Sequence, residues 1–177
     1  SGANLTVTGA GDLTLTATNP VSATTSAKST QAGQPSTGVG ASVAIAIASI
    51  ATRAEVEDTA AIGGVRNLSL TASTTPTLNT TALAGAAGGN TTIGGSFALL
   101  LDDVKTIARV GTRTGSTALT GAISVRALEQ PGTVVTAADG TVAGSSTGVG
   151  AAIAISIATH RVNATTDQKS IQEVQAR

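Results

Sequence analysis

Apolar and polar residues alternate in short segments that recur along the chain about every 55 residues. Residues 13–16 read Leu-Thr-Leu-Thr, residues 68–71 read Leu-Ser-Leu-Thr, and residues 123–126 read Ile-Ser-Val-Arg. An alternation of period two places one side of a β-strand in the core and the other side in water. We therefore predict a strand at the same place in each of three repeats.

A longer apolar segment follows in each repeat. Residues 36–53 read STGVGASVAIAIASIATR, and residues 146–161 repeat them as STGVGAAIAISIATHR. Small residues alternate with β-branched ones, which predicts a strand buried on both faces, with large side chains packing one way and small ones the other. An apolar run also fits a buried helix, so strand and helix both stay open for this segment. The ranges concerned are 39–51, 95–101 and 149–158.

Between these two segments lies a third that is more polar. It reads SATTSAKST at 22–30, LNTTALAGAAGG at 78–89 and TVVTAADGT at 133–141. Its Thr and Ser content is typical of a strand on a solvated face. Each repeat is therefore expected to contain three strands.

A regular period means that one unit stacks on copies of itself. We predict a single repeat domain over 1–177, with repeats at 3–57, 58–112 and 113–167 and a polar tail or linker at 168–177. The predicted class is all-β, a repeat-built β-solenoid or stacked-sheet domain. The alternative, if the apolar segment is helical, is a β-barrel-like sheet enclosing a buried apolar helix.

Composition narrows the possible functions. Hydrophobic residues make up 41% of the chain, yet Phe97 is the single aromatic residue and there is no Trp, Tyr, Met or Cys. The core must therefore consist of Ala, Val, Ile and Leu, and disulfides, thiolate catalysis and cysteine zinc sites are excluded. Ten basic residues balance ten acidic ones, without a basic stripe or aromatic stacking platform, so we expect no nucleic-acid partner.

Membrane insertion is not expected either. The longest apolar run, from Val39 to Ala51, is shorter than the roughly 20 residues of a spanning helix. Its interior also contains Gly40 and Ser42. No leader segment is visible, and the start Ser1-Gly2 is typical of an excised fragment, which we expect to be soluble.

Two glycine motifs resemble catalytic or cofactor motifs. Residues 144–148 match G-x-S-x-G, with Ser146 as the central serine and His160 as the one histidine downstream. That motif needs a helix after the serine, and a β-branched strand follows here. Residues 37–40 resemble half of a dinucleotide fingerprint but lack the third glycine. We interpret both as turns between repeats, and we expect the protein not to be an enzyme.

The remaining polar candidates also favour structural interpretations. Asp102 and Asp103 could contribute to a cation site, but no further ligand pattern surrounds them, so we expect the strand to end there and turn into solvent. Glu55, Glu57 and Asp58 are expected at a wet strand edge. His160 lacks partners for a metal site and is expected on the surface. No catalytic, cofactor-binding or metal-binding residue is assigned, and no cofactor is expected.

Four sequence segments carry a family resemblance: GDLTLTAT, TTALAGAAGG, STGVGASVAIAIASIATRAEVED and ALTGAISV. They resemble the tandem repeats of giant bacterial surface adhesins, including leukotoxin-like and filamentous-haemagglutinin-like large exoproteins. The resemblance covers nearly all of residues 3–165. It implies a secreted or cell-surface location outside the bacterium, an elongated β-rich stalk, and no catalytic residues.

The expected function is therefore a structural stalk or spacer whose partners are neighbouring repeats of the same polypeptide. The alternative is an adhesive module that contacts host-cell or matrix surfaces through variable loops at Lys28–Pro35, Gly85–Thr92 and Thr112–Thr117. Sheet edges left bare by excision are also expected to cause weak self-association of the fragment.

Overall fold

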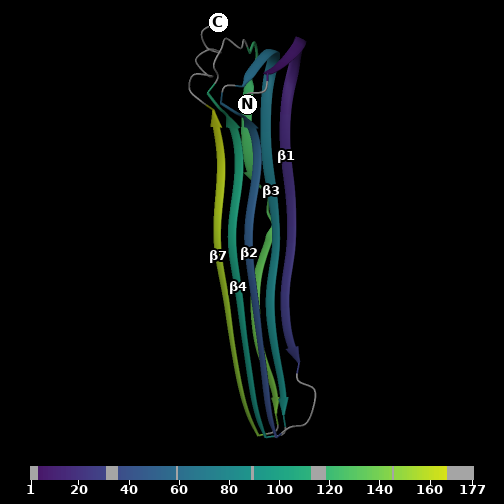
Figure 1. The fold of residues 1–177 in the computed structure, drawn as a ribbon, viewed down its shortest axis with the longest axis vertical. Helices are drawn as coiled ribbons and strands as arrows, with labels where there is room; N and C mark the ends of the chain where they lie inside the picture. Colours follow the sequence, from purple (N-terminus) through teal and green to yellow (C-terminus); the bar gives the residue numbers. More distant parts are fainter. Residues whose placement is uncertain are drawn as a thin grey trace.

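The computed structural model describes residues 4–30, 36–58, 60–88, 90–112, 119–144 and 146–166, and the chain forms a long, narrow molecule (Figure 1). Two sheets, each made of parallel strands, lie against each other. Sheet A contains β1 (Asn4–Thr30), β3 (Ala61–Gly88), β5 (Ile123–Glu129) and β6 (Thr133–Gly144). Sheet B contains β2 (Thr37–Val56), β4 (Thr91–Val110) and β7 (Thr147–Thr166). Each repeat therefore runs along sheet A and returns along sheet B, as Figure 1 shows.

Equivalent residues of successive repeats pair across each sheet. In sheet A, Leu13 pairs with Leu68, which pairs with Ile123. In sheet B, Val43 pairs with Phe97, which pairs with Ile153. The strand order is β1-β3-β5 in one sheet, with β6 also paired to β3, and β2-β4-β7 in the other. This in-register stacking confirms the predicted all-β class and fits a β-solenoid.

The structure confirms the strand interpretation of the apolar segments: each is a strand, none of the described residues forms a helix, and the alternative of a sheet enclosing a helix is excluded. The expectation of three strands per repeat is wrong for the first two repeats, because the alternating segment and the polar segment form one continuous strand in β1 and β3. The polar segment lies over the core as well, since Leu78 and Thr80 are buried in β3.

The third repeat is the exception, because its sheet A strand is divided into β5 and β6. Glu129 pairs with Thr74 and Thr133 pairs with Thr77, so three residues on one side span two on the other. This extra residue has the form of a β-bulge. The bulge lies opposite Pro76, which has no N–H to donate to a neighbouring strand.

The interior changes in width along the strands. At one end, Leu68 and Leu70 of sheet A pack against Ala54 and Val56 of sheet B. At the other end, near the turns that join the sheets, the facing residues are alanines: Ala82 packs with Ala44 and Ala98. Beyond these alanines the backbones nearly touch. A Cβ atom added to Gly40 would lie 2.3 Å from the carbonyl oxygen of Gly85.

We name the two halves of sheet B for this difference. The glycine-rich half comprises residues 37–47 of β2 with their partners 91–101 and 147–157, next to the turns. The charged half comprises residues 49–56, 103–110 and 159–166. Residues 48, 102 and 158 lie at the boundary between them.

Candidate functional sites

Large apolar side chains cover the outer surface of the glycine-rich half. Since the small residues of β2, such as Ala44, face sheet A, the alternate residues point outward. They align across β2, β4 and β7 in four columns, and we call this surface the apolar face. The columns are Val39–Ile93–Val149, Val43–Phe97–Ile153, Ile45–Leu99–Ile155 and Ile47–Leu101–Ile157.

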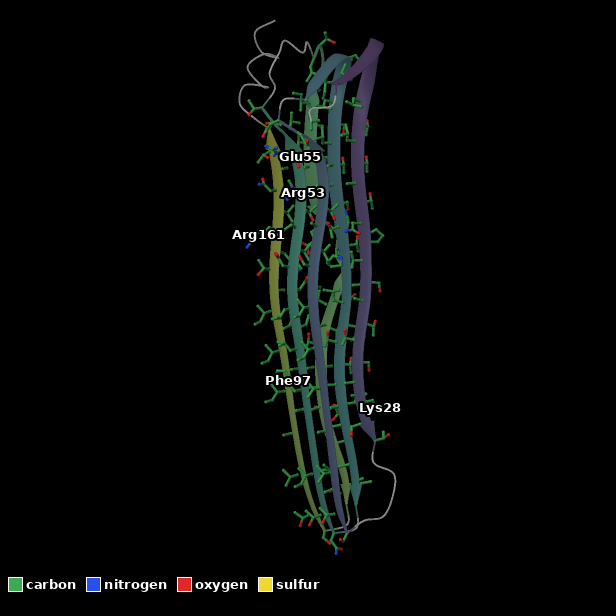
Figure 2. The ribbon with its side chains drawn as sticks, viewed as in Figure 1. Lys28, Arg53, Glu55, Phe97 and Arg161 are labelled. Atoms are coloured by element: carbon green, nitrogen blue, oxygen red, sulfur yellow. The ribbon has the colours of Figure 1, made fainter. Side chains whose placement is uncertain are left out.

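The exposure of this face contradicts the expectation of a strand buried on both sides. Ile47 is 76% exposed, Val43 is 60% exposed, and Ile153 is 56% exposed. The sheets close on the side where Gly, Ala and Ser allow a near approach, and no third layer among the described residues covers the other side. From strand spacing and rise, the four columns span roughly 400 Å². Figure 2 shows Phe97 in this half.

Charged side chains occupy the same outer surface in the charged half. The Arg109 guanidinium donates to Glu55 on the neighbouring strand at 2.5 Å and to Asp58 at 3.2 Å. Lys105 donates to Asp103 at 2.7 Å, and this hydrogen bond lowers the pKa of the Asp103 carboxyl from its ordinary value. Figure 2 places Arg53 and Glu55 in this half. The outer surface of sheet B is therefore divided into an uncharged part and a part of mixed charge.

A polar cluster built around one buried carboxylate lies between the sheets near the boundary. Asp102 points inward from β4 and its side chain has no exposed surface. His160 of β7 lies beside it, with 2.9 Å between Nε2 and the Asp102 Oδ2. The other ring nitrogen of His160 contacts the carboxylate of Glu129, which ends β5 in the opposite sheet. The histidine therefore joins the two sheets through two carboxylates.

The charge state of His160 follows from these neighbours. Burial of the ring lowers the pKa of His160, but the hydrogen bond to Asp102 and the negative charge of Glu129 outweigh burial, so the pKa is raised above its ordinary value. A protonated ring donates from both nitrogens and satisfies both carboxylates at once. The second oxygen of Asp102, Oδ1, is buried without a hydrogen-bond partner.

The cluster does not have the geometry of a metal site. Its two ring nitrogens point in opposite directions, so Asp102, His160 and Glu129 cannot direct three ligand atoms at one ion. Within the described part of the chain, no group of three His, Cys, Asp or Glu side chains could hold a metal. The arrangement can instead exchange a proton and hold the sheets together while that proton is bound.

Buried threonines form a second contact between the sheets. Thr74 of β3 donates its hydroxyl to Thr52 of β2 at 2.7 Å. Its oxygen also lies 2.7 Å from the hydroxyl of Thr106 on β4. Because Thr74 has one hydroxyl proton, Thr106 is the donor in the second bond. One sheet A side chain thus links two neighbouring strands of sheet B.

The serine and histidine suggested by the G-x-S-x-G motif lie far apart. Ser146 directly precedes β7 and His160 lies within it, 14 residues later, a separation of roughly 45 Å along the strand. They cannot act on one substrate together. Gly38 and Gly40 of the other motif lie within β2, and Gly40 contacts sheet A rather than an open phosphate site.

Two other expectations about polar residues need correction. The strand does not end at Asp102 and Asp103, since β4 continues to Val110, with Asp102 facing inward and Asp103 outward. His160 is an exposed residue, as expected, although its ring reaches the buried Asp102. Glu55 lies inside β2 in an ion pair, whereas Glu57 and Asp58 follow the strand and are exposed, as expected.

The variable segments proposed as binding loops are only partly described. Lys28–Thr30 and Gly85–Gly88 lie in β1 and β3 and are strand rather than loop. Residues 31–35, 89 and 113–118 lie outside the described part of the chain, as does the predicted tail at 168–177. Sequence reasoning missed the apolar face, although the alternation of Ala and Ile that builds it was evident.

No helix among the described residues has the length and apolar character needed to cross a membrane. Comparisons with known proteins identify no family model, no curated protein and no solved structure that matches this chain.

Proposed function

We propose that the chain is a structural repeat segment, a stalk or spacer, of a large secreted or cell-surface bacterial adhesin. The observation that carries the proposal is the in-register parallel stacking of three successive repeats in both sheets. Such stacking uses each repeat to complete the core of its neighbour. The resemblance of the repeated segments to giant exoproteins supports an exported location.

The edges of the stack favour continuation by further repeats. Strands β1 and β2 border one end of the two sheets, and β5, β6 and β7 border the other. An exposed edge strand presents a row of unpaired N–H and C=O groups that invites further pairing. Another repeat of the same kind would satisfy these groups along strands 20 residues or more in length.

The geometry also determines what shape such a segment makes. A strand of 28 residues spans roughly 90 Å. Each added repeat extends the stack by only about 4.8 Å, the distance between strands. Three repeats therefore make a broad, thin plate whose long dimension follows the strands, and a stalk of this kind lengthens along the stacking direction in proportion to the number of repeats.

Small-angle scattering on a tandem duplication of residues 4–166 tests this proposal. The doubled array should keep the roughly 90 Å dimension and grow by about 15 Å along the stacking direction. Two separate bodies joined end to end would contradict continued stacking. For the role itself, host-cell binding by a parent protein should depend on repeat number and withstand replacement of Thr112–Thr117. Loss of binding on that replacement alone would favour an adhesive module.

A further inference from the structure

We propose that the apolar face of sheet B is an interface between two copies of this chain, packed face to face with their strands antiparallel. The inference goes beyond the proposed stalk function and does not depend on it. It starts from the difference between the two outer surfaces of the molecule. Outward positions of β3 in sheet A are mostly hydroxyl residues, such as Thr71, Ser73 and Thr75, whereas those of the apolar face are aliphatic apart from Phe97.

The chemistry of the apolar face favours a second copy over a lipid surface. Interfacial membrane binding uses Trp or Tyr and basic side chains around an apolar centre. The chain has no Trp or Tyr, and the four columns contain no charge. The charges beyond them alternate in sign, as in the pair Asp103 and Lys105. A flat array of Val, Ile and Leu is instead suited to pack against another such sheet.

The relative direction of the two copies follows from the charged half. If the strands were parallel, Arg53 and Glu55 of one copy would be buried against those of the other, at a desolvation cost. If the strands are antiparallel, the charged halves extend past the contact on opposite sides and stay in water. A two-fold axis along the stacking direction achieves this arrangement and places β2 on β2, β4 on β4 and β7 on β7.

The registration of the two copies follows from residue size. A column of small residues, Ala41–Gly95–Ala151, lies between two columns of the apolar face. With the two-fold axis on the column of Phe97, this small column faces Ile45–Leu99–Ile155 of the other copy. Large side chains then enter a shallow groove. Moving the axis two residues toward the charged half would place Lys105 against Ile93 and Asp103 against Gly95.

The contact area determines how strong the association should be. Each copy contributes roughly 400 Å² over three repeats, about half of the 800 Å² per partner of a standard stable interface. The isolated chain should therefore dimerise weakly. Since repeat faces repeat across the axis, each additional repeat would add roughly 130 Å² per partner. Longer arrays would pair firmly.

Sedimentation equilibrium on the chain tests the interface. The weight-average mass should rise above the 17.0 kDa of one chain with increasing concentration. The double variant Ile45→Lys/Ile155→Lys should weaken dimerisation at least about tenfold, because it buries four lysines per dimer. The matched control Ser26→Lys/Thr77→Lys adds the same charge to the outer surface of sheet A and should dimerise like the parent. A circular dichroism spectrum and thermal midpoint like the parent's would establish that each variant is folded.

Crosslinking tests the registration and separates this interface from pairing at sheet edges. The chain has no cysteine, so Val43→Cys and Ala51→Cys each introduce one thiol on the same surface of β2. Val43 lies on the two-fold axis, and a thiol-specific crosslinker about 10 Å long matches the spacing of packed sheets. The two Ala51 positions would be roughly 50 Å apart. Val43→Cys should give covalent dimers and Ala51→Cys should not.

Three results would overturn the proposal. The first is a monomer at every concentration. The second is equal crosslinking of the two cysteine variants, or equal dimerisation of the Lys variants, which would indicate edge pairing. The third is flotation of the parent with neutral phosphatidylcholine vesicles without dimerisation, which would make a lipid surface the partner of the apolar face.

Discussion

The two halves of the sheet pair reverse the placement of large side chains. In the glycine-rich half the interior is made of small residues such as Gly40 and Ala44, apart from Leu100 at its border, and the other large residues point outward. In the charged half the interior holds Val104 and Val110, while Arg and Glu side chains face outward. Along the same strands, the large side chains therefore lie mainly on the outer face in one half and on the inner face in the other.

This reversal teaches that sheet separation determines which face of a strand is buried. Backbones that nearly touch at Gly40 and Gly85 leave no room for a large side chain between them. Ile and Val in that half can point only outward. Where Leu68 and Leu70 keep the sheets apart, apolar residues turn inward and charged residues can occupy the surface. Variants in the two halves test this comparison, and we expect the largest effect in the interior of the charged half.

Leu70→Ala should cause the largest loss of stability. Leu70 has no exposed surface and lies in the cluster that separates the sheets in the charged half. Its truncation leaves a cavity and should lower the free energy of unfolding by about 2–5 kcal/mol. Urea unfolding followed by circular dichroism measures this loss. Leu83→Ala is the matched control, because Leu83 lies on the opposite side of β3 and is only half-buried. Equal losses for the two variants would contradict the assigned faces.

Gly40→Ala should be the next most damaging change, although it adds only one methyl group. The new Cβ would lie 2.3 Å from a backbone carbonyl oxygen, so the sheets must separate. Overpacking of this kind costs about 1–3 kcal/mol. The control is Gly95→Ala on the outer side of β4, where nothing lies within 4 Å of the new Cβ. That variant should be neutral or slightly stabilising, since glycine is unfavourable in a strand. An unchanged free energy of unfolding for Gly40→Ala would mean that backbone contact does not determine the sheet separation in the glycine-rich half.

His160→Gln tests the boundary between the halves through its dependence on pH. The folded pKa of His160 is raised above its ordinary 6.5. The stabilisation is therefore fully present below pH 6.5 and is lost as the pH rises through the folded pKa. Near pH 5.5 the variant should be about 1–3 kcal/mol less stable, because the buried Asp102 carboxylate loses its charged donor. Urea unfolding from pH 5.5 to 9 should show this difference shrinking. A difference that is constant with pH would contradict a protonated bridge.

The repeats and their strands were predictable from sequence because both are periodic properties of the chain. Leu13 and Leu68 lie at equivalent places in the repeat, and they do pair. The partners of His160 were not predictable in this way. Asp102 lies 58 residues away in sequence and Glu129 belongs to the other sheet, so their meeting depends on the register of three strands. Phe97 illustrates a further limit, since alternation defines two faces of a strand but not which one has a neighbour.

Ile47→Thr should have the smallest effect on the stability of a single chain. Ile47 is 76% exposed on the apolar face, so its removal leaves no cavity, and threonine keeps the β-branched shape that suits a strand. The free energy of unfolding, measured at low concentration where the chain is monomeric, should change by less than about 0.5 kcal/mol. Ile50→Thr is the matched comparison on the same strand, because Ile50 is buried against Leu78 and Val104. A loss at Ile47 as large as at Ile50 would mean that the outer surface of the glycine-rich half is already covered in the monomer, and the reversal between the two halves would not hold.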